Sequence, residues 1–154
     1  MTDRRADVAI LMADDDPDDR LLARDAFAEA RMHNRIVFVE DGEEVIEYLN
    51  RRGKFRDAVA YPMPGLILLD LNMPRRDGRE VLAEIKADPA FKHIPVVVLT
   101  TSRAEEDVMK SYRNGGNSYI VKPVTFRELT EVVREIGRYW LGVVDLPHPE
   151  SGAA

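Results

Sequence analysis

Short apolar runs alternate with segments of helical character along this 154-residue chain. Each run is too short for a helix and has the unbroken apolar character of a strand buried on both faces. The runs occupy residues 8–13, 36–39, 66–69, 96–99 and 119–121. Strands that alternate with helices favour a parallel sheet covered on both sides, so we predict a doubly wound α/β domain.

Polar residues follow four of these runs, at the end that parallel strands share. In chain order they are Asp14, Asp15 and Asp16; Asp70; Thr100, Thr101 and Ser102; and Lys122. Each is ordinary by itself, because Asp, Ser and Thr are common in turns and helix caps. Ligands of open α/β sheets bind outside the carboxyl ends of the strands. Together these residues therefore indicate one site.

Composition narrows the function. The formal net charge is −6, which provides no electrostatic footprint for nucleic acid or for an anionic membrane. The absence of cysteine excludes disulfides, thiol catalysis and Cys-based zinc sites. No apolar stretch approaches the roughly 20 residues that span a bilayer. We expect a single cytoplasmic domain over residues 1–154.

Capping residues mark where helices begin. The marks are Asp16 with Pro17, Asp41 with Glu44, Ser102 with Glu105, and Thr125 with Glu128. A further helix is predicted over residues 78–87, after a Pro-containing turn. In the first helix we expect Leu21, Leu22, Ala26 and Ala30 to face the sheet.

Two segments do not fit the alternation. Residues 51–65 are polar, contain Gly and Pro, and are predicted to be a surface insertion. Residues 141–154 extend past the last expected helix, and the chain is apolar from about Tyr139 to Pro147. An apolar extension of this kind favours a homodimer, although a tail folded back on its own domain is the alternative.

Carboxylates gathered in one pocket require a proton or a cation. Two unit charges about 4 Å apart interact by roughly 4 kcal/mol at an effective dielectric constant of 20. Oxygen ligands alone favour a hard cation, which is Mg²⁺, or alternatively Mn²⁺ or Ca²⁺. Lys122 and Thr100 can bind an anion beside that cation. This set suits phosphoryl transfer, with Asp70 as the nucleophile and Asp14 and Asp15 as metal ligands.

Five short motifs carry a resemblance to a known family. They are residues 10–15 (ILMADD), 68–74 (LLDLNMP), 77–78 (DG), 98–100 (VLT) and 122–123 (KP). In this order and on these strands they resemble the receiver domain of two-component response regulators, over about residues 8–138. The resemblance implies a flavodoxin-like sheet of order 2-1-3-4-5 with five helices on its two faces.

The resemblance also implies a function. Asp70 would accept a phosphoryl group from a phosphohistidine of a sensor histidine kinase, with Mg²⁺ as cofactor. Asp15, Asp70 and the backbone carbonyl of Asn72 would bind the metal directly, and Asp14 would bind it mostly through water. The protein would be a phosphorylation switch rather than an enzyme that turns over other substrates.

Further residues take roles from the same resemblance. Lys122 and Thr100 would contact the phosphoryl group, and Thr101 would flank it where receivers usually have a smaller residue. Thr100 and the aromatic Tyr119 would form the switch, and the Lys122–Pro123 bond would be cis. Asn72 and Ser102 occupy positions that tune dephosphorylation, so the lifetime of the phosphorylated state stays open.

A narrower resemblance concerns the partners. The 51–65 loop, the 99–102 and 117–119 segments and the 139–141 ending resemble single-domain regulators that partner phytochrome-type sensor kinases. The expected output is a protein–protein contact, because no DNA-binding segment is visible. The contact face would be formed by the helix predicted after Ser102, the strand at residues 119–121 and the helix predicted after Thr125. An intermediate phosphotransfer protein of a phosphorelay is the alternative.

Other classes fit the residues less well. A haloacid-dehalogenase phosphatase also uses an aspartyl nucleophile and Mg²⁺, but it expects a second Asp where this chain has Asn72. A scaffold that never takes phosphate would be signalled by loss of Asp70, Lys122 or the acidic pair, and all are present. A flavin site would need a phosphate-binding loop after the first strand, where this chain is acidic.

Overall fold

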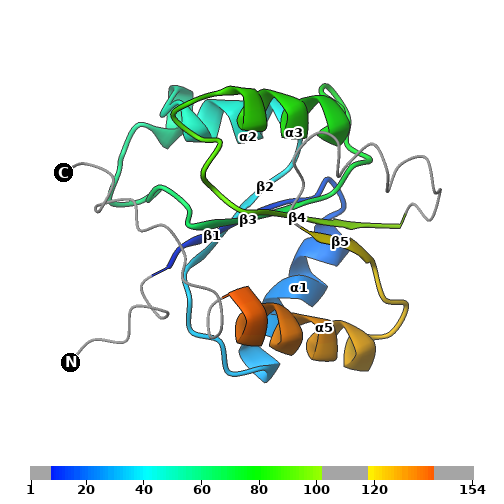
Figure 1. Ribbon diagram of the computed structural model, residues 1–154. Helices are drawn as coiled ribbons and strands as arrows, with labels where there is room; N and C mark the ends of the chain where they lie inside the picture. The colour runs from blue at the N-terminus through cyan, green and yellow to red at the C-terminus, as the bar shows by residue number, and fades with distance from the viewer. Residues whose placement is uncertain (1–7, 102–117, 141–154) are drawn as a thin grey trace.

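The computed structural model describes residues 8–101 and 118–140. Its core is one parallel sheet of five strands in the order β2-β1-β3-β4-β5 (Figure 1). The strands are β1 (Ile10–Ala13), β2 (Ile36–Val39), β3 (Leu66–Leu69), β4 (Val96–Thr100) and β5 (Ser118–Val121). The predicted doubly wound fold and its strand order are confirmed.

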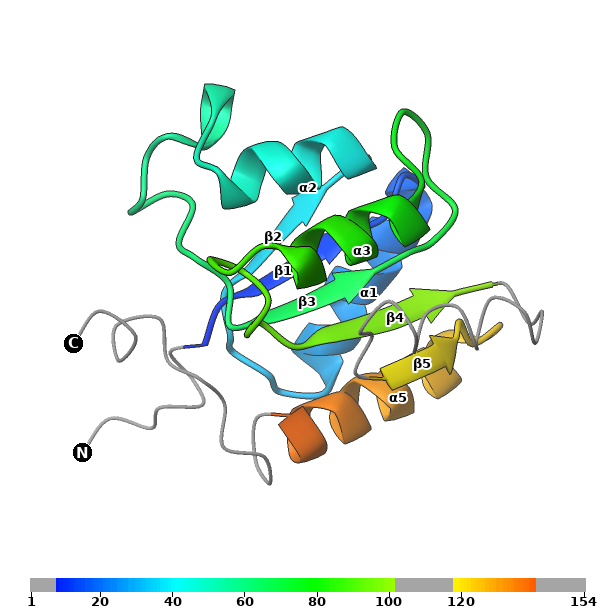
Figure 2. The same ribbon diagram turned by 45° about the horizontal axis from the view of Figure 1, so that its top comes forward.

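Helices cover both faces of the sheet. On one face lie α1 (Pro17–Glu29) and α5 (Phe126–Arg138), and on the other lie α2 (Gly42–Leu49) and α3 (Gly78–Ala87) (Figures 1 and 2). The described residues therefore hold four of the five predicted α-helices. The helix expected after Ser102 and the extension at residues 141–154 fall outside the described ranges. Within those ranges, every helix is too short or too polar to cross a bilayer.

The register places the ends of the strands at one level. Ala13, the last residue of β1, pairs with Val39 on one side and with Leu69 on the other. On the far side of the sheet, Thr100 at the end of β4 pairs with Val121 at the end of β5. The residues that follow the strands are consequently neighbours along one edge.

The predicted caps begin three of the helices. Backbone N–H groups donate to Asp16 at 2.9 Å, to Asp41 at 2.8 Å and to Thr125 at 3.1 Å. Glu44 does not complete the expected box with Asp41, since its carboxylate accepts from the backbone N–H of Glu40 instead, at 2.7 Å. The acid still satisfies a free donor before the helix, one residue earlier.

The rotation of α1 differs from the prediction. Leu21 and Leu22 are 55% and 43% exposed, whereas Ala26 is buried as predicted, and the buried face of the helix consists of Ala23, Ala26 and Phe27. These three positions form a stripe at spacings of three and four residues, in which two small alanines let the helix approach the sheet and one large ring fills the core.

The 51–65 segment is not only a surface loop. It contains a short 3-10 helix, η2 (Gly53–Phe55), and Phe55 is 2% exposed. The Phe55 ring lies 5.1 Å from the rings of both Tyr48 and Tyr61, measured between centroids. Tyr48 also donates to the carbonyl of Pro62 at 2.7 Å. The segment thus packs against α2 and adds to the core.

Candidate functional site: an acidic pocket at the strand ends

Three carboxylates gather where β1 and β3 end. Asp14, Asp15 and Asp70 each offer an oxygen, and these oxygens lie within 4.8 Å of one another. Asp14 is fully buried, Asp70 is buried and Asp15 is exposed. The sheet ladder fixes the two buried acids, because Asp14 N–H donates to Val39 O and Asp70 N–H donates to Ala13 O, both at 3.1 Å.

Lys122 brings the only ammonium that contacts these acids within the described ranges. Its Nζ donates to Asp14, to Asp19 at 2.9 Å and to Asp70 at 3.1 Å. Its backbone N–H donates to the Thr100 carbonyl at 2.8 Å, which holds the start of the β5–α5 loop against β4. The Lys122 side chain is 11% exposed, so its contacts with the buried Asp14 and Asp70 are largely shielded from water.

Burial and neighbouring charges shift the pKa values of Asp14 and Lys122. Burial raises the pKa of the Asp14 carboxyl above its usual value, and the hydrogen bond from Lys122 opposes the shift. Burial alone would lower the pKa of Lys122, but its hydrogen bonds and the charges of Asp14, Asp19 and Asp70 raise it. Lys122 therefore keeps its proton at neutral pH.

Asp70 accepts hydrogen bonds on both oxygens. The Thr100 hydroxyl and the Asn72 backbone N–H donate to Asp70 Oδ1, each at 3.0 Å. Asn72 Nδ2 donates in turn to Thr100 Oγ1 at 3.3 Å. Of the predicted site residues, Asp14, Asp15, Asp70, Asn72, Thr100 and Lys122 are thus brought together.

Other predicted site residues lie apart from the carboxylates. Thr101 is exposed directly after β4. Within the described residues, no hydrogen bond connects it to an acid of the pocket. Tyr119 is partly buried on β5, opposite Val98, and packs against the core on the α2 and α3 side. The Lys122–Pro123 bond is trans, which corrects the cis expectation carried over from the resemblance.

Sequence reasoning missed Asp19. Asp19 stands in the first turn of α1, where an acid is favourable to the helix dipole whether or not it has any other role. In the structure Asp19 lies four residues before Ala23, on the helix stripe that faces the sheet. An acid on the buried stripe of a helix was the signal that could have identified it.

The carboxylate oxygens of this cluster are suitable ligands for a hard divalent cation. Lys122 contacts three acids, and Asp15 lies beside two of them, so one positive charge faces four carboxylates. All the ligand atoms in the cluster are oxygens, which Mg²⁺ prefers. Asp14, Asp15 and Asp70 are the residues that would hold the ion, and its two charges would offset most of the remaining negative charge.

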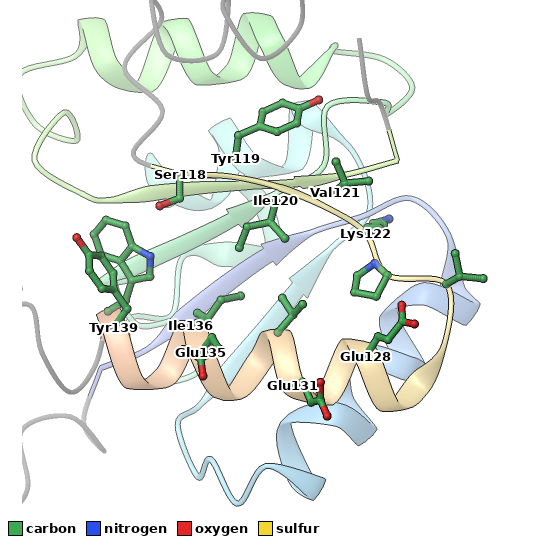
Figure 3. A pocket seen from close by; sticks show the side chains of 14 residues that line it. Ser118, Tyr119, Ile120, Val121, Lys122, Glu128, Glu131, Glu135, Ile136 and Tyr139 are labelled. Atoms are coloured by element: carbon green, nitrogen blue, oxygen red, sulfur yellow. The ribbon is translucent and has the colours of Figure 1, made fainter. Parts of the chain in front are cut away.

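A second concavity lies beside the pocket. A groove of about 720 Å³ runs between β5 and α5, with Lys122 at one end and Tyr139 at the other (Figure 3), and Trp140 also lines it. Three acids of α5 line it, Glu128, Glu131 and Glu135. Lys122 lines the groove and also contacts the acids of the pocket.

Comparisons with known proteins agree with this geometry. A family model described as the response regulator receiver domain matches residues 10–134. Response regulator Rcp1 of Synechocystis is 41% identical over 138 residues, which cover 90% of this chain and 92% of Rcp1. The probable methanogenesis regulatory protein FilR2 of Methanothrix harundinacea is 38% identical, over 91% of this chain and 88% of FilR2.

Solved structures share the fold. The phosphorylated cyanobacterial phytochrome response regulator RcpA has a TM-score of 0.85 and 43% identity, over 93% of this chain and 100% of RcpA. The Mn²⁺-bound form of Rcp1 has a TM-score of 0.82 and 40% identity, over 92% of this chain and 99% of Rcp1.

Proposed function

Since the chain belongs to the receiver domains of response regulators, we propose that Asp70 accepts a phosphoryl group from a phosphohistidine of a sensor histidine kinase. Receiver domains are signalling modules that bind Mg²⁺ at an acidic pocket, and the matching acids are present in this chain. The observation that carries the proposal is the convergence of Lys122, Thr100 and Asn72 on Asp70.

The transfer balances with these residues. An oxygen of the Asp70 carboxylate attacks phosphorus and forms the new O–P bond of an acyl phosphate. The P–N bond to the donor histidine breaks, and the imidazole nitrogen leaves with the electron pair. Asp14, Asp15, Asp70 and the carbonyl of Asn72 would hold Mg²⁺, which when bound neutralises charge on the phosphoryl oxygens.

The protein's other residues bind and report the phosphoryl group. Lys122 places its charge beside the equatorial oxygens, and Thr100 turns its hydroxyl from Asp70 to one of them. Thr101, which is exposed immediately after Thr100, would limit access to the acyl phosphate from solvent. The movement of Thr100, together with Tyr119, passes the change to the face of β5 and α5, where the groove supplies the contact surface for a protein partner.

The relatives suggest the setting. RcpA is a phytochrome response regulator, so a phytochrome-type kinase in the cytoplasm is the proposed phosphodonor, with the chain acting as one receiver domain.

The exposed Tyr139 supports a homodimer. Its side chain is 53% exposed, and the sequence that follows it at residues 141–147 is largely apolar. Sedimentation of the full chain tests this: a monomer at high concentration, unchanged by Tyr139→Asp, would end the dimer proposal.

Phosphorylation is tested with a small donor. The full chain is incubated with acetyl phosphate, with and without Mg²⁺, and the added phosphoryl group is followed by intact mass spectrometry. We expect Mg²⁺-dependent label on the parent and on Asp25→Asn, which changes an exposed acid of α1, and none on Asp70→Asn. A parent protein that takes no label would contradict the proposed phosphorylation. Label that persists on Asp70→Asn would contradict only the assignment of Asp70 as the phosphorylated residue.

A further inference from the structure

Asp19 contacts the ammonium of Lys122 from helix α1. Its Oδ2 lies 2.9 Å from Lys122 Nζ, and its side chain is partly buried. The residue sits in the first turn of α1, on the stripe that continues through Ala23 and Phe27 toward the sheet. This contact has no part in the phosphoryl transfer described above.

The three hydrogens of the ammonium are shared among three acids. Two of the acceptors, Asp14 and Asp70, also belong to the cluster that can hold a cation. Asp19 is not a member of that cluster. Once a cation and a phosphoryl group engage Asp14 and Asp70, Asp19 is, of the three acids that contact Lys122 in the described part of the chain, the one still available to Lys122 alone.

Lys122 needs such an anchor because its side chain is long. A lysine has four rotatable carbon–carbon bonds, and fixing all of them in one geometry costs conformational entropy. A small cavity of about 50 Å³ lies beside the ammonium, lined by Asp14, Asp19 and Lys122 and by apolar side chains that include Leu99 and Leu129. Among the described residues of this lining, Thr125 is the one other polar side chain, and its hydroxyl oxygen accepts from the Glu128 backbone N–H at 3.1 Å.

We propose that Asp19 is a positioning residue, which holds the Lys122 ammonium beside Asp70 so that the charge is in place when the phosphoryl oxygens arrive. This role rests on the proposed phosphorylation of Asp70. During transfer to Asp70 from acetyl phosphate, the O–P bond to acetate breaks and acetate leaves with the electron pair. Asp19 exchanges no proton and forms no bond; it acts only through Lys122.

Simple charge effects predict the opposite result. An acid near the pocket repels an anionic donor, so its removal by itself should speed phosphorylation or leave it unchanged. Asp18 provides the matched control, since it is exposed, lies in the same first turn and carries the same charge. Among the described residues, no ion pair joins Asp18 to Lys122.

The experiment compares the two acids in the full chain. Initial rates of phosphorylation are measured over a range of acetyl phosphate concentrations at saturating Mg²⁺. Asp19→Asn should lower the maximal rate constant of phosphorylation about fivefold to tenfold, because the misplaced ammonium stabilises the transition state less. The acetyl phosphate concentration that gives half of this maximal rate should change little. Asp18→Asn should stay within about twofold of the parent, and Asp19→Glu should restore part of the loss.

A spectroscopic signature separates positioning from folding. In a proton–nitrogen correlation spectrum of lysine ammonium groups, the Lys122 signal should persist in the parent and in Asp18→Asn. It should broaden by solvent exchange in Asp19→Asn, while the thermal unfolding midpoint confirms that this variant is folded. If Asp19→Asn folds poorly, Asp19→Gln against Asp18→Gln gives the same comparison.

The outcomes are distinct. Equal rates for the Asp18 and Asp19 variants, or an unchanged Lys122 signal, would overturn the role of Asp19 and leave phosphorylation of Asp70 standing. A parent protein that takes no label from acetyl phosphate would overturn the phosphorylation itself.

Discussion

Thr100 donates its hydroxyl hydrogen bond to Asp70 across 3.0 Å, from the neighbouring strand end and thirty residues along the chain. Both side chains are buried, and Asn72 donates to the same hydroxyl oxygen. The hydroxyl can satisfy only one acceptor at a time. Any group that draws the Thr100 hydrogen away from Asp70 must therefore reorganise this small network.

The first prediction concerns that hydroxyl. Thr100→Val keeps the shape of the side chain and removes the donor, so the variant should lose about 1 kcal/mol of unfolding free energy. It should still be phosphorylated at Asp70, but beryllofluoride with Mg²⁺ should no longer change amide hydrogen exchange in β5. Thr100→Ser, which retains the hydroxyl, should respond like the parent. A normal response of the valine variant would show that Thr100 is not the switch.

The second prediction concerns competition between Lys122 and the metal. Lys122→Met removes an ammonium that shares oxygens with Mg²⁺, and charges about 4 Å apart interact by roughly 4 kcal/mol at a dielectric constant of 20. We expect Mg²⁺ to bind at least about tenfold more tightly, which needs only about 1.4 kcal/mol. Calorimetric titration measures this, with the exposed Lys92→Met as control. Unchanged or weaker Mg²⁺ binding by the Lys122 variant would contradict the prediction.

The third prediction concerns pH and Glu44. Burial by itself would raise the pKa of Glu44, but hydrogen bonds from Lys54 and the Glu40 N–H lower it below its usual value of 4.5. A carboxyl with a lowered folded pKa stabilises the fold above the unfolded pKa, and the contribution is lost as pH falls through the folded value.

Glu44→Gln should therefore cost about 0.5–1 kcal/mol of unfolding free energy at pH 7. The cost should shrink as the pH falls from near 4.5 through the lower, folded pKa. Urea unfolding at several pH values checks this, with Glu29→Gln on the exposed side of α1 as control. A cost that is constant with pH would mean that the charge of Glu44 is not responsible.

The fourth prediction concerns the backbone beside Asp70. A Cβ added at Gly78 would lie 2.3 Å from the Asp70 carbonyl oxygen and 2.6 Å from Leu71 Cα, and neither atom can move without the chain. Gly78→Ala should cost about 3 kcal/mol or more, at the upper end of overpacking, and weaken Mg²⁺ binding. Gly137→Ala meets only the end of the Met32 side chain and should cost far less. Equal unfolding midpoints of the two variants would refute this.

Much of the fold could be predicted because its signals are local. An apolar run buried on both faces and a capping residue before a helix are visible within a few positions, as in Leu66–Leu69 and at Asp41. The rotation of α1 could not be predicted, since Leu21 and Leu22 are as apolar as the residues that were buried. Phe55 was missed for a similar reason: its partners Tyr48 and Tyr61 follow no helical or strand period.

The sequence by itself determined which residue types stand at the strand ends, because short apolar runs fix where each strand stops. Only the tertiary structure decided how they meet. Asp19 and Lys122 are 103 residues apart, and no local pattern joins them. Parallel register levels the strand ends, and the packing of α1 turns Asp19 toward the ammonium, so the contact exists only once both are in place.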